Sequence, residues 1–357
     1  MRGRVQVLMK NSRKYIGAVV LLAGIMVGLC GCGTTNENVS AGMQAIKSLD
    51  YQSALASFEE AGKQGENERL ISRGMGIAYM GLTQYAQASA CFEEALKRSN
   101  GLLEPMDYDL NYYLASAYTK ENRLSEAEAT YDAILTMKPQ ELDALFLRGN
   151  VRLGLGKMDG AVEDFDKVVS MEPENYDRII QIYEVLNYYG ETAAGKEYLQ
   201  NALEKENAKI SAYDKGRMYY YLEEYQKACL ALEEAKGKGG AEAYLYLGRA
   251  YEATGDYNYA ANVYNAYLAK DKTNAEIYNQ LGLCEMTRGE YAKALAAFQA
   301  GMNAENNSIK QTLAFNEIVA YEHLGEFQKA TVLMQTYLQN YPDDAKALRE
   351  YEFLSTR

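Results

Sequence analysis

Small and bulky apolar residues recur along most of the chain at the spacing that marks one face of a helix. In each copy a small residue is followed four positions later by a bulky apolar residue, and three positions after that by another small or apolar one. Offsets of three and four bring side chains onto one face of an α-helix, so each copy predicts an amphipathic helix. The copies begin, at intervals of 32 to 39 residues, with Ala54, Ala88, Ala127, Ala161, Gly195, Ala228, Ala260, Ala294 and Ala330.

A second pattern precedes these helices and predicts another helix in front of each one. Twelve residues before the small residue the chain usually carries a glycine, and three residues after that place a tyrosine often recurs. Each copy therefore predicts two amphipathic helices joined by a turn. The glycines are Gly42, Gly76, Gly149, Gly216, Gly248 and Gly282, and the bulky residues of the second helices are Phe58, Phe92, Tyr131, Phe165, Leu199, Leu232, Tyr264, Phe298 and Met334.

The fullest copy spans residues 241–274 and carries Tyr244, Leu247, Gly248, Tyr251, Gly255, Asp256, Tyr257, Ala260 and Tyr264. This pattern resembles the tetratricopeptide repeat. The resemblance implies an all-α fold, an α-α superhelix (solenoid) of about nine helix-turn-helix repeats over residues 39–342. It also implies that the glycine lets the two helices approach closely and that the bulky residue fills the space between neighbouring repeats. We expect residues 343–357 to form a C-terminal capping helix, because a solenoid must cover its last repeat.

Two segments depart from the period. The interval between Ala88 and Ala127 holds five extra residues, which fall around 101–107 and include Pro105. This segment predicts a break in the superhelix. Glycines at 237, 239 and 240 replace the usual turn, so residues 237–240 predict a flexible joint, with a shortened turn as the alternative.

The first 31 residues have the pattern of an export signal. Basic residues precede an uncharged apolar run from Tyr15 to Leu29, which is shorter than the roughly 20 residues of a membrane-spanning helix. The run ends in Leu29-Cys30-Gly31-Cys32, which resembles the lipobox of bacterial lipoproteins. The resemblance implies a signal peptide over residues 1–31, lipid attached to Cys32, and a short spacer over residues 32–38. An uncleaved signal anchor is the alternative.

A lipid on Cys32 would fix the location of the protein. Two acyl chains hold a protein at a membrane durably. We therefore expect an exported protein anchored to a bacterial cell membrane, on the outer face of the cytoplasmic membrane or on the outer membrane if the host has one.

The composition argues against catalysis. His323 is the single histidine, so neither a histidine-based triad nor a multi-histidine metal site can be built. The segment Gly154-Leu155-Gly156-Lys157 lacks the leading glycine and the following serine or threonine of a phosphate-binding loop. A formal net charge of −12 disfavours nucleic acid as a partner. We expect no catalytic residues, no metal, no cofactor and no enzymatic activity.

The concave surface lined by the first helices is the remaining candidate for a functional site. Arg217 and Arg249 would lie on adjacent repeats there and could donate bidentate hydrogen bonds to a carboxylate of a partner. Internal pairing of these arginines with Glu184 or Glu252 is the alternative. The predicted groove residues are Tyr112, Phe146, Asn150, Tyr213, Arg217, Tyr220, Arg249, Asn279 and Phe315.

Two classes of function fit this surface. The first is a membrane-anchored scaffold that binds a peptide or helix of a protein partner at the bacterial cell envelope. The second is a surface lipoprotein that binds glycans or solutes by stacking them on exposed aromatic rings. The open groove of a solenoid gives a small ligand little enclosure, which favours the first.

Overall fold

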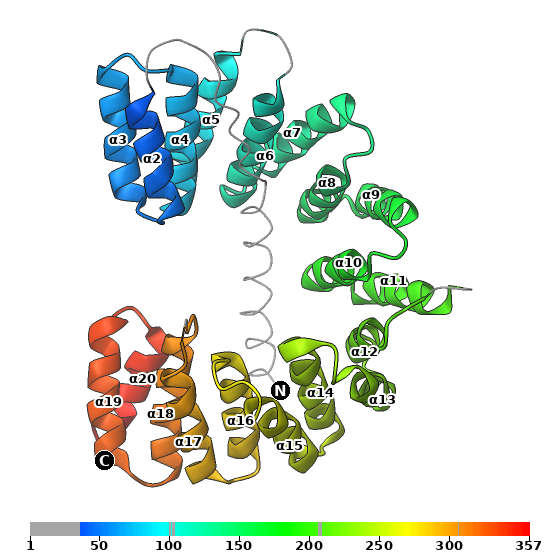
Figure 1. Cartoon of the computed structure of the whole chain (residues 1–357), viewed down its shortest axis with the longest axis vertical. Helices are drawn as coiled ribbons and strands as arrows, with labels where there is room; N and C mark the ends of the chain where they lie inside the picture. Colours follow the sequence, from blue (N-terminus) through cyan, green and yellow to red (C-terminus); the bar gives the residue numbers. More distant parts are fainter. Residues whose placement is uncertain (1–35, 100, 102–103, 206–208, 306) are drawn as a thin grey trace. The chain divides into compact units, whose positions relative to one another are not determined.

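The computed structural model describes residues 36–357 except 100, 102–103, 206–208 and 306 (Figure 1). Over these residues the chain forms nineteen helices, α2 to α20, and no strands. None of the described helices has the length and apolar character needed to cross a lipid bilayer. The predicted signal peptide and Cys32 lie outside the described residues.

The helices form nine antiparallel pairs followed by a single helix, as the period predicts. We number the pairs, or hairpins, from one to nine in chain order. The pairs are α2 (Glu37–Lys47) with α3 (Tyr51–Lys63), α4 (Glu68–Gly81) with α5 (Tyr85–Lys97), α6 (Pro105–Lys120) with α7 (Leu124–Met137), α8 (Leu142–Gly154) with α9 (Met158–Met171), α10 (Tyr176–Tyr188) with α11 (Thr192–Glu204), α12 (Ala212–Tyr221) with α13 (Tyr225–Ala235), α14 (Gly240–Thr254) with α15 (Tyr257–Leu268), α16 (Ala275–Thr287) with α17 (Tyr291–Met302), and α18 (Lys310–His323) with α19 (Phe327–Asn340). The last helix is α20 (Ala345–Leu354), so the prediction of about nine repeats and a capping helix is confirmed.

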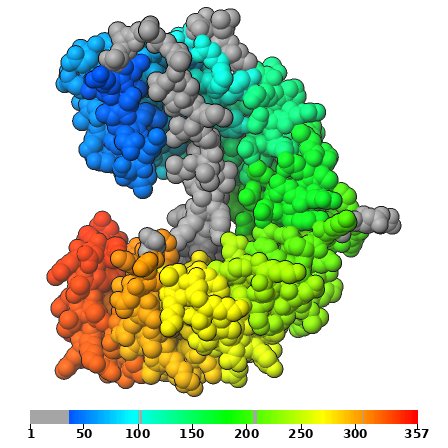
Figure 2. Space-filling view, in the orientation of Figure 1, coloured from blue at the N-terminus to red at the C-terminus, as the bar shows by residue number. Residues whose placement is uncertain are grey.

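The chain divides into two compact units, of which the first ends at Gly195 and the second begins at Lys196. Within each unit the hairpins follow one another in chain order (Figure 2). The boundary lies inside α11, at neither of the two segments where the sequence predicts a break or a joint. After the first of those segments, α6 begins at Pro105, and Asp107 in its first turn pairs with Arg69 of α4.

The core of every hairpin is built from the small and bulky positions of the period. The alanines that begin the motif are fully buried in all eight copies that have one. The bulky residues four positions later are also buried, and none is more than 2% exposed. Burying one such side chain stabilises the fold by about 1.5–3 kcal/mol.

The recurring glycines explain how the two helices of a hairpin come so close. A Cβ atom placed on Gly42, Gly76, Gly149, Gly216, Gly248 or Gly282 would lie 2.2 to 2.7 Å from the bulky residue of the same hairpin. Real Cβ atoms do not approach that closely, so the bulky side chain fits because the glycine has none. Phe58 also lies against Gly74 of the next hairpin, and Phe92 stacks on Tyr113 of the next hairpin at 5.3 Å. The bulky side chains therefore fill space within a hairpin and, at these two, between hairpins.

In the fifth hairpin the large and the small residue of this contact are exchanged between the two helices. Tyr183 stands on α10 where the other hairpins usually have glycine, and Gly195 stands on α11 where they have alanine. A Cβ atom on Gly195 would lie 3.1 Å from Cδ2 of Tyr183 and 3.3 Å from Cβ of Leu186. The missing side chain on α11 thus makes room for the tyrosine on α10.

Capping residues mark where several helices begin or end, both within hairpins and between them. Side chains at the N-caps accept hydrogen bonds from backbone N–H groups that have no partner within the helix. Gly255 ends α14 in the left-handed region, at φ 87°, which a glycine adopts without strain. The N-cap side chains that accept such a bond are Asp50, Asn67, Asn175, Ser211, Asn274 and Asp344.

Candidate functional site

The predicted groove residues lie on first helices of both units, and each unit is described by itself. In the first unit they lie on α6 and α8, and in the second on α12, α14, α16 and α18. The first-unit residues are Tyr112, Phe146 and Asn150, and the second-unit residues are Tyr213, Arg217, Tyr220, Arg249, Asn279 and Phe315.

In the first unit, the ring of Phe146 is covered by a residue of the next hairpin. The guanidinium of Arg178, at the start of α10, lies 4.6 Å from the centroid of the Phe146 ring. Arg178 also pairs with Asp143 on α8, which keeps it over the ring. Phe146 is 6% exposed, so little of its ring is open, and its contact with a partner stays a prediction. The cation–π contact instead ties two hairpins together.

The other two first-unit residues are half-buried. The ring of Tyr112 meets Tyr131 edge-on with centroids 6.3 Å apart. Burial, together with the nearby Glu141 and Asp143, raises the pKa of Tyr112 above its ordinary value. Asn150 lies one turn after Phe146 on α8 and is also partly exposed. Their contact with a partner stays a prediction.

At the end of the second unit, Phe315 is covered in the same way as Phe146. The Lys346 ammonium of α20 lies 4.2 Å from the centroid of its ring, and Phe315 is 7% exposed. Little of its ring is open, and its contact with a partner stays a prediction. Asn279 on α16 is buried too, and its Oδ1 accepts a hydrogen bond of 2.8 Å from Nδ2 of Asn316.

Arg217 is held inside the second unit by its own helix. Its Nη2 lies 2.5 Å from Oδ1 of Asp214, and its guanidinium lies 4.5 Å from the centroid of the Tyr213 ring. The residue is 8% exposed. Arg217 is thus paired internally with Asp214, whereas its pairing with Glu184 or Glu252 stays a prediction.

A cluster of five tyrosines surrounds this part of the second unit. We define the tyrosine cluster as Tyr213, Tyr220, Tyr221, Tyr225 and Tyr246. Tyr246 meets Tyr213, Tyr220 and Tyr221 edge-on, with centroids 5.6 to 6.4 Å apart. The hydroxyls of Tyr221 and Tyr246 are 2.9 Å apart, and the Tyr213 hydroxyl donates to Glu242 at 2.5 Å.

Three members of this cluster are not among the predicted groove residues. Tyr221 and Tyr225 flank the turn between α12 and α13, and Tyr246 lies on α14, three residues before Arg249. The available signal was composition, because the chain has 32 tyrosines and no tryptophan. The repeat period alone does not indicate that these three rings meet.

Arg249 lies on α14 beside the tyrosine cluster and is held more loosely than Arg217. Its side chain is 24% exposed, and its Nη2 lies 3.3 Å from Oε1 of Glu276, whose own side chain is 51% exposed. Glu252, one turn further on α14, accepts a 2.8 Å hydrogen bond from the Tyr264 hydroxyl. Burial raises the pKa of Glu252, while the Tyr264 hydroxyl and Arg249 act in the opposite direction.

The described residues show little that is typical of a catalytic or metal site. Across them, no group of three or more histidine, cysteine, aspartate or glutamate side chains is placed to hold a metal ion. His323 stacks on Tyr291 with centroids 4.7 Å apart. This contact gives the single histidine a packing role.

Comparisons with known proteins agree with the repeat pattern. The sequence model described as tetratricopeptide repeat matches residues 73–141, 125–177, 213–275 and 245–307, which together cover more than half of the chain. The chain is also similar to a crystal structure of a tetratricopeptide repeat protein from Parabacteroides merdae. That similarity has a TM-score of 0.44 and 13% identity, and it covers 71% of this chain and 98% of the other.

Two curated relatives match this chain over less than a third of their own length. RNA polymerase II-associated protein 3 of Rattus norvegicus is 23% identical over 219 residues, which are 61% of this chain and 30% of that protein. BBSome complex member BBS4 of Bos taurus is 22% identical over 142 residues, which are 40% of this chain and 26% of that protein. The chain thus spans less than a third of the length of either relative.

Proposed function

The chain belongs to the tetratricopeptide repeat family, and on that basis we propose that it is a non-enzymatic scaffold that binds a protein partner through the first-helix surface of its second unit. The partner would present an extended peptide or a helix with an acidic side chain. The scaffold would be exported and anchored by lipid on Cys32 at the bacterial cell envelope.

The ion pair between Arg249 and Glu276 is the observation that supports this binding site. Glu276 is half exposed and its contact with Arg249 is long, so a carboxylate of a partner could replace it at little cost. The tyrosine cluster lies beside this arginine and supplies rigid rings. Tyrosine and arginine are the residues that most often dominate the binding energy of an interface.

The same geometry argues against the glycan-binding alternative. Sugar stacking needs open ring faces, and the rings of Phe146 and Phe315 are covered by Arg178 and Lys346. The members of the tyrosine cluster meet one another edge-on. A surface of this kind fits a polypeptide better than a flat sugar ring.

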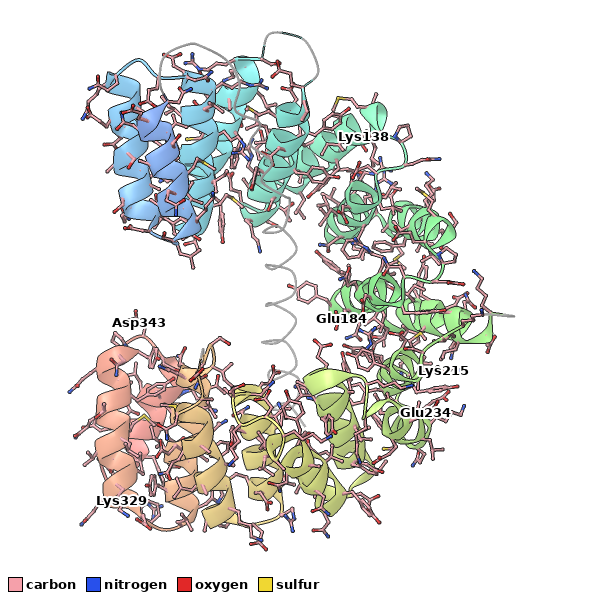
Figure 3. The ribbon with its side chains drawn as sticks, in the orientation of Figure 1. Lys138, Glu184, Lys215, Glu234, Lys329 and Asp343 are labelled. Carbon is pink, nitrogen blue, oxygen red and sulfur yellow. The ribbon has the colours of Figure 1, made fainter. Side chains whose placement is uncertain are left out.

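Replacing Arg249 tests the binding site. We expect Arg249→Ala to reduce stoichiometric capture of the protein partner from detergent-solubilised membranes about tenfold or more, as loss of an interface anchor does. Lys215→Ala is the matched control, because it removes one positive charge from an exposed position on α12 (Figure 3). Equal capture by Arg249→Ala and the unchanged protein, with the same helical circular dichroism, would remove Arg249 from the proposed site.

A change at Cys32 tests the anchor. The basic start, the uncharged apolar run and the Leu29-Cys30-Gly31-Cys32 segment support the proposal. We expect Cys32→Ser to abolish incorporation of a labelled fatty acid and to block cleavage before residue 32, whereas Cys30→Ser should preserve both. Labelling of the Cys32→Ser protein at the unchanged level would exclude Cys32 as the lipid acceptor.

A further inference from the structure

The first helix of the array is capped by a residue from a later segment rather than by its own N-cap. The side chain of Asn36, the N-cap of α2, accepts no capping hydrogen bond from that helix. The buried carboxylate of Glu66 takes this role. Its Oε1 accepts hydrogen bonds of 2.9 and 2.8 Å from N and Nδ2 of Asn38, and its Oε2 accepts one of 2.9 Å from N of Val39. All three donors belong to the first turn of α2.

Asn36 reaches in turn to the link between α3 and α4. Its Oδ1 accepts a 3.1 Å hydrogen bond from N of Asn67, whose own side chain caps α4. We define the contacts of Glu66 and Asn67 with the start of α2 as the clasp. The clasp joins residues 36–39 to residues 66–67, so the chain enters the array beside the link between the first two hairpins.

This link lies on one edge of the first unit. Because the helices of a hairpin are antiparallel, first helices begin and second helices end at one edge, and the turns within hairpins lie at the opposite edge. Nε of Arg69 donates to the carbonyl of Ala95 at 3.2 Å, and Arg98 pairs with Glu68, so the end of α5 shares the edge of the link. We define the link edge as residues 63–69 and 95–98.

Exposed charges on the link edge are paired with acidic or basic neighbours. Nζ of Lys63 lies 3.2 Å from Oε2 of Glu60. Arg98 pairs with Glu94, at 2.9 Å, as well as with Glu68. The chain as a whole has a formal net charge of −12, and an acidic surface is repelled by a membrane that carries anionic lipids. Paired charges avoid that repulsion, so the link edge suits a layer of lipid head groups.

The proposed lipid on Cys32 lies only a short length of chain away from the clasp. Residues 33–35 separate Cys32 from Asn36. A chain spans at most about 3.6 Å per residue, so the Cα atom of Asn36 lies within about 14 Å of that of Cys32. Fraying of α2 would lengthen this tether toward Asp50, the N-cap of α3. The clasp opposes that fraying and keeps the tether short.

Building on the proposed lipid anchor, we propose that the link edge of the first unit lies against the membrane, and that the clasp holds it there by limiting the tether to residues 33–35. The surface that it contacts is the head-group layer of a phospholipid bilayer. The opposite edge of the first two hairpins carries the turns at residues 48–50 and 82–84 and faces away from the lipid.

Photo-cross-linking of the lipidated full chain tests the membrane-facing edge. The protein is placed in vesicles of phosphatidylethanolamine and phosphatidylglycerol, some of whose phosphatidylethanolamine carries a diazirine on its head group. Adducts are mapped by peptide mass spectrometry. We expect severalfold more adducts on the link edge than on the turns at residues 48–50 and 82–84. Equal labelling of the two edges would overturn the proposal.

Lengthening the tether provides a variant that leaves the folded array unchanged. An insert of about twenty glycine and serine residues after residue 35 has an average span of about 25 Å. We expect this insert to remove the difference in labelling between the two edges. A difference that persists with the long tether would show that the short tether does not orient the first unit.

Glu66→Gln tests the clasp itself. Glutamine has one acceptor oxygen, whereas the donors from α2 use both oxygens of the carboxylate. Amide exchange of α2 should accelerate about two- to thirtyfold, the factor that loss of an N-cap gives, and adducts on the link edge should fall. Glu59→Gln, at an exposed position on α3, makes the same change of charge and should alter neither. If the two variants agree in either measurement, the clasp does not set the tether.

The intact mass of the protein distinguishes this proposal from the anchor on which it rests. A chain without acyl groups on Cys32 would remove the anchor and the membrane-facing edge together. A lipidated chain whose two edges are labelled equally would remove the membrane-facing edge and leave the anchor in place.

Discussion

At the scale of single residues, the fit of a ring against a glycine determines how closely the two helices of a hairpin approach. Gly248 shows this fit with a tyrosine. A Cβ atom there would lie 2.3 Å from Cε1 and Cζ of Tyr264, whose hydroxyl also holds Glu252. Tyr264 is fully buried and has no room to withdraw.

We predict that Gly248→Ala destabilises the protein by about 1–3 kcal/mol, which is the usual cost of overfilling a packed core. The free energy of unfolding is obtained from urea denaturation followed by circular dichroism. Gly237→Ala is the control, because nothing lies within 4 Å of a Cβ atom at that position. Equal effects of the two changes would mean that the fit against Tyr264 is not what limits this position.

The sequence predicts the contact between the glycine and the bulky residue of a hairpin. It does not predict that Arg178 and Lys346 cover the rings of Phe146 and Phe315. The glycine and the bulky residue of a hairpin recur at a fixed offset, so their contact follows from the period. Arg178 and Lys346 belong to the helix that follows each hairpin, and they stand outside the repeating positions. The period therefore indicates that Phe146 and Phe315 face the groove, whereas their exposure depends on side chains that it does not describe.

At the scale of elements, a buried ionic cluster joins α7, α8 and α9. Asp164 on α9 is fully buried and accepts hydrogen bonds from two arginines of α8. Nε and Nη2 of Arg148 lie 2.9 and 2.6 Å from its two carboxylate oxygens, and Nη1 of Arg152 lies 2.9 Å from one of them. Nε of Arg152 donates to Glu128 of α7 at 3.0 Å. This cluster fixes α8 between its two neighbours.

Removing the central carboxylate should therefore cost far more than a surface charge does. We predict that Asp164→Asn destabilises the protein by about 3–5 kcal/mol, because it leaves two largely buried guanidinium groups without their shared partner. Glu163→Gln, the exposed neighbour on α9, should change the free energy of unfolding by less than about 0.5 kcal/mol. A loss below about 1 kcal/mol for Asp164→Asn would show that water replaces the carboxylate.

The order of the helices could be predicted from the sequence, because it depends on the apolar period. The ionic cluster could not be predicted in this way. The period places Asp164, three residues after Ala161, on the buried face of α9 and leaves Glu163 off that face. It does not indicate which arginines pair with the buried carboxylate, because that depends on the packing of α8 on α9.

At the scale of the whole molecule, stability is expected to be distributed along the chain rather than concentrated in one core. Helices pack mainly on their immediate neighbours, and the chain divides into two compact units. The stability of such an array is the sum of its repeats and their nearest-neighbour contacts. Damage to one hairpin should accordingly remain local.

We predict that Phe165→Ala, which empties a fully buried position of α9, costs about 3–5 kcal/mol. Hydrogen exchange should accelerate in α7 to α10 and stay unchanged in α16 to α19. Met171→Ala, at an exposed position of the same helix, serves as the control. Uniform acceleration across both units would show that the chain unfolds as one cooperative body.

In the fifth hairpin the large residue, Tyr183, stands on the first helix and the small residue, Gly195, on the second. This exchange restricts where recombination between repeats of the gene can fall. A crossover between α10 and α11 would set Tyr183 against an alanine in one hybrid and leave a glycine facing Gly195 in the other, so one product is overfilled and the other hollow. Breakpoints that fall between hairpins would carry Tyr183 and Gly195 together. Lengthening or shortening of the array should therefore proceed by whole hairpins wherever the fifth one takes part.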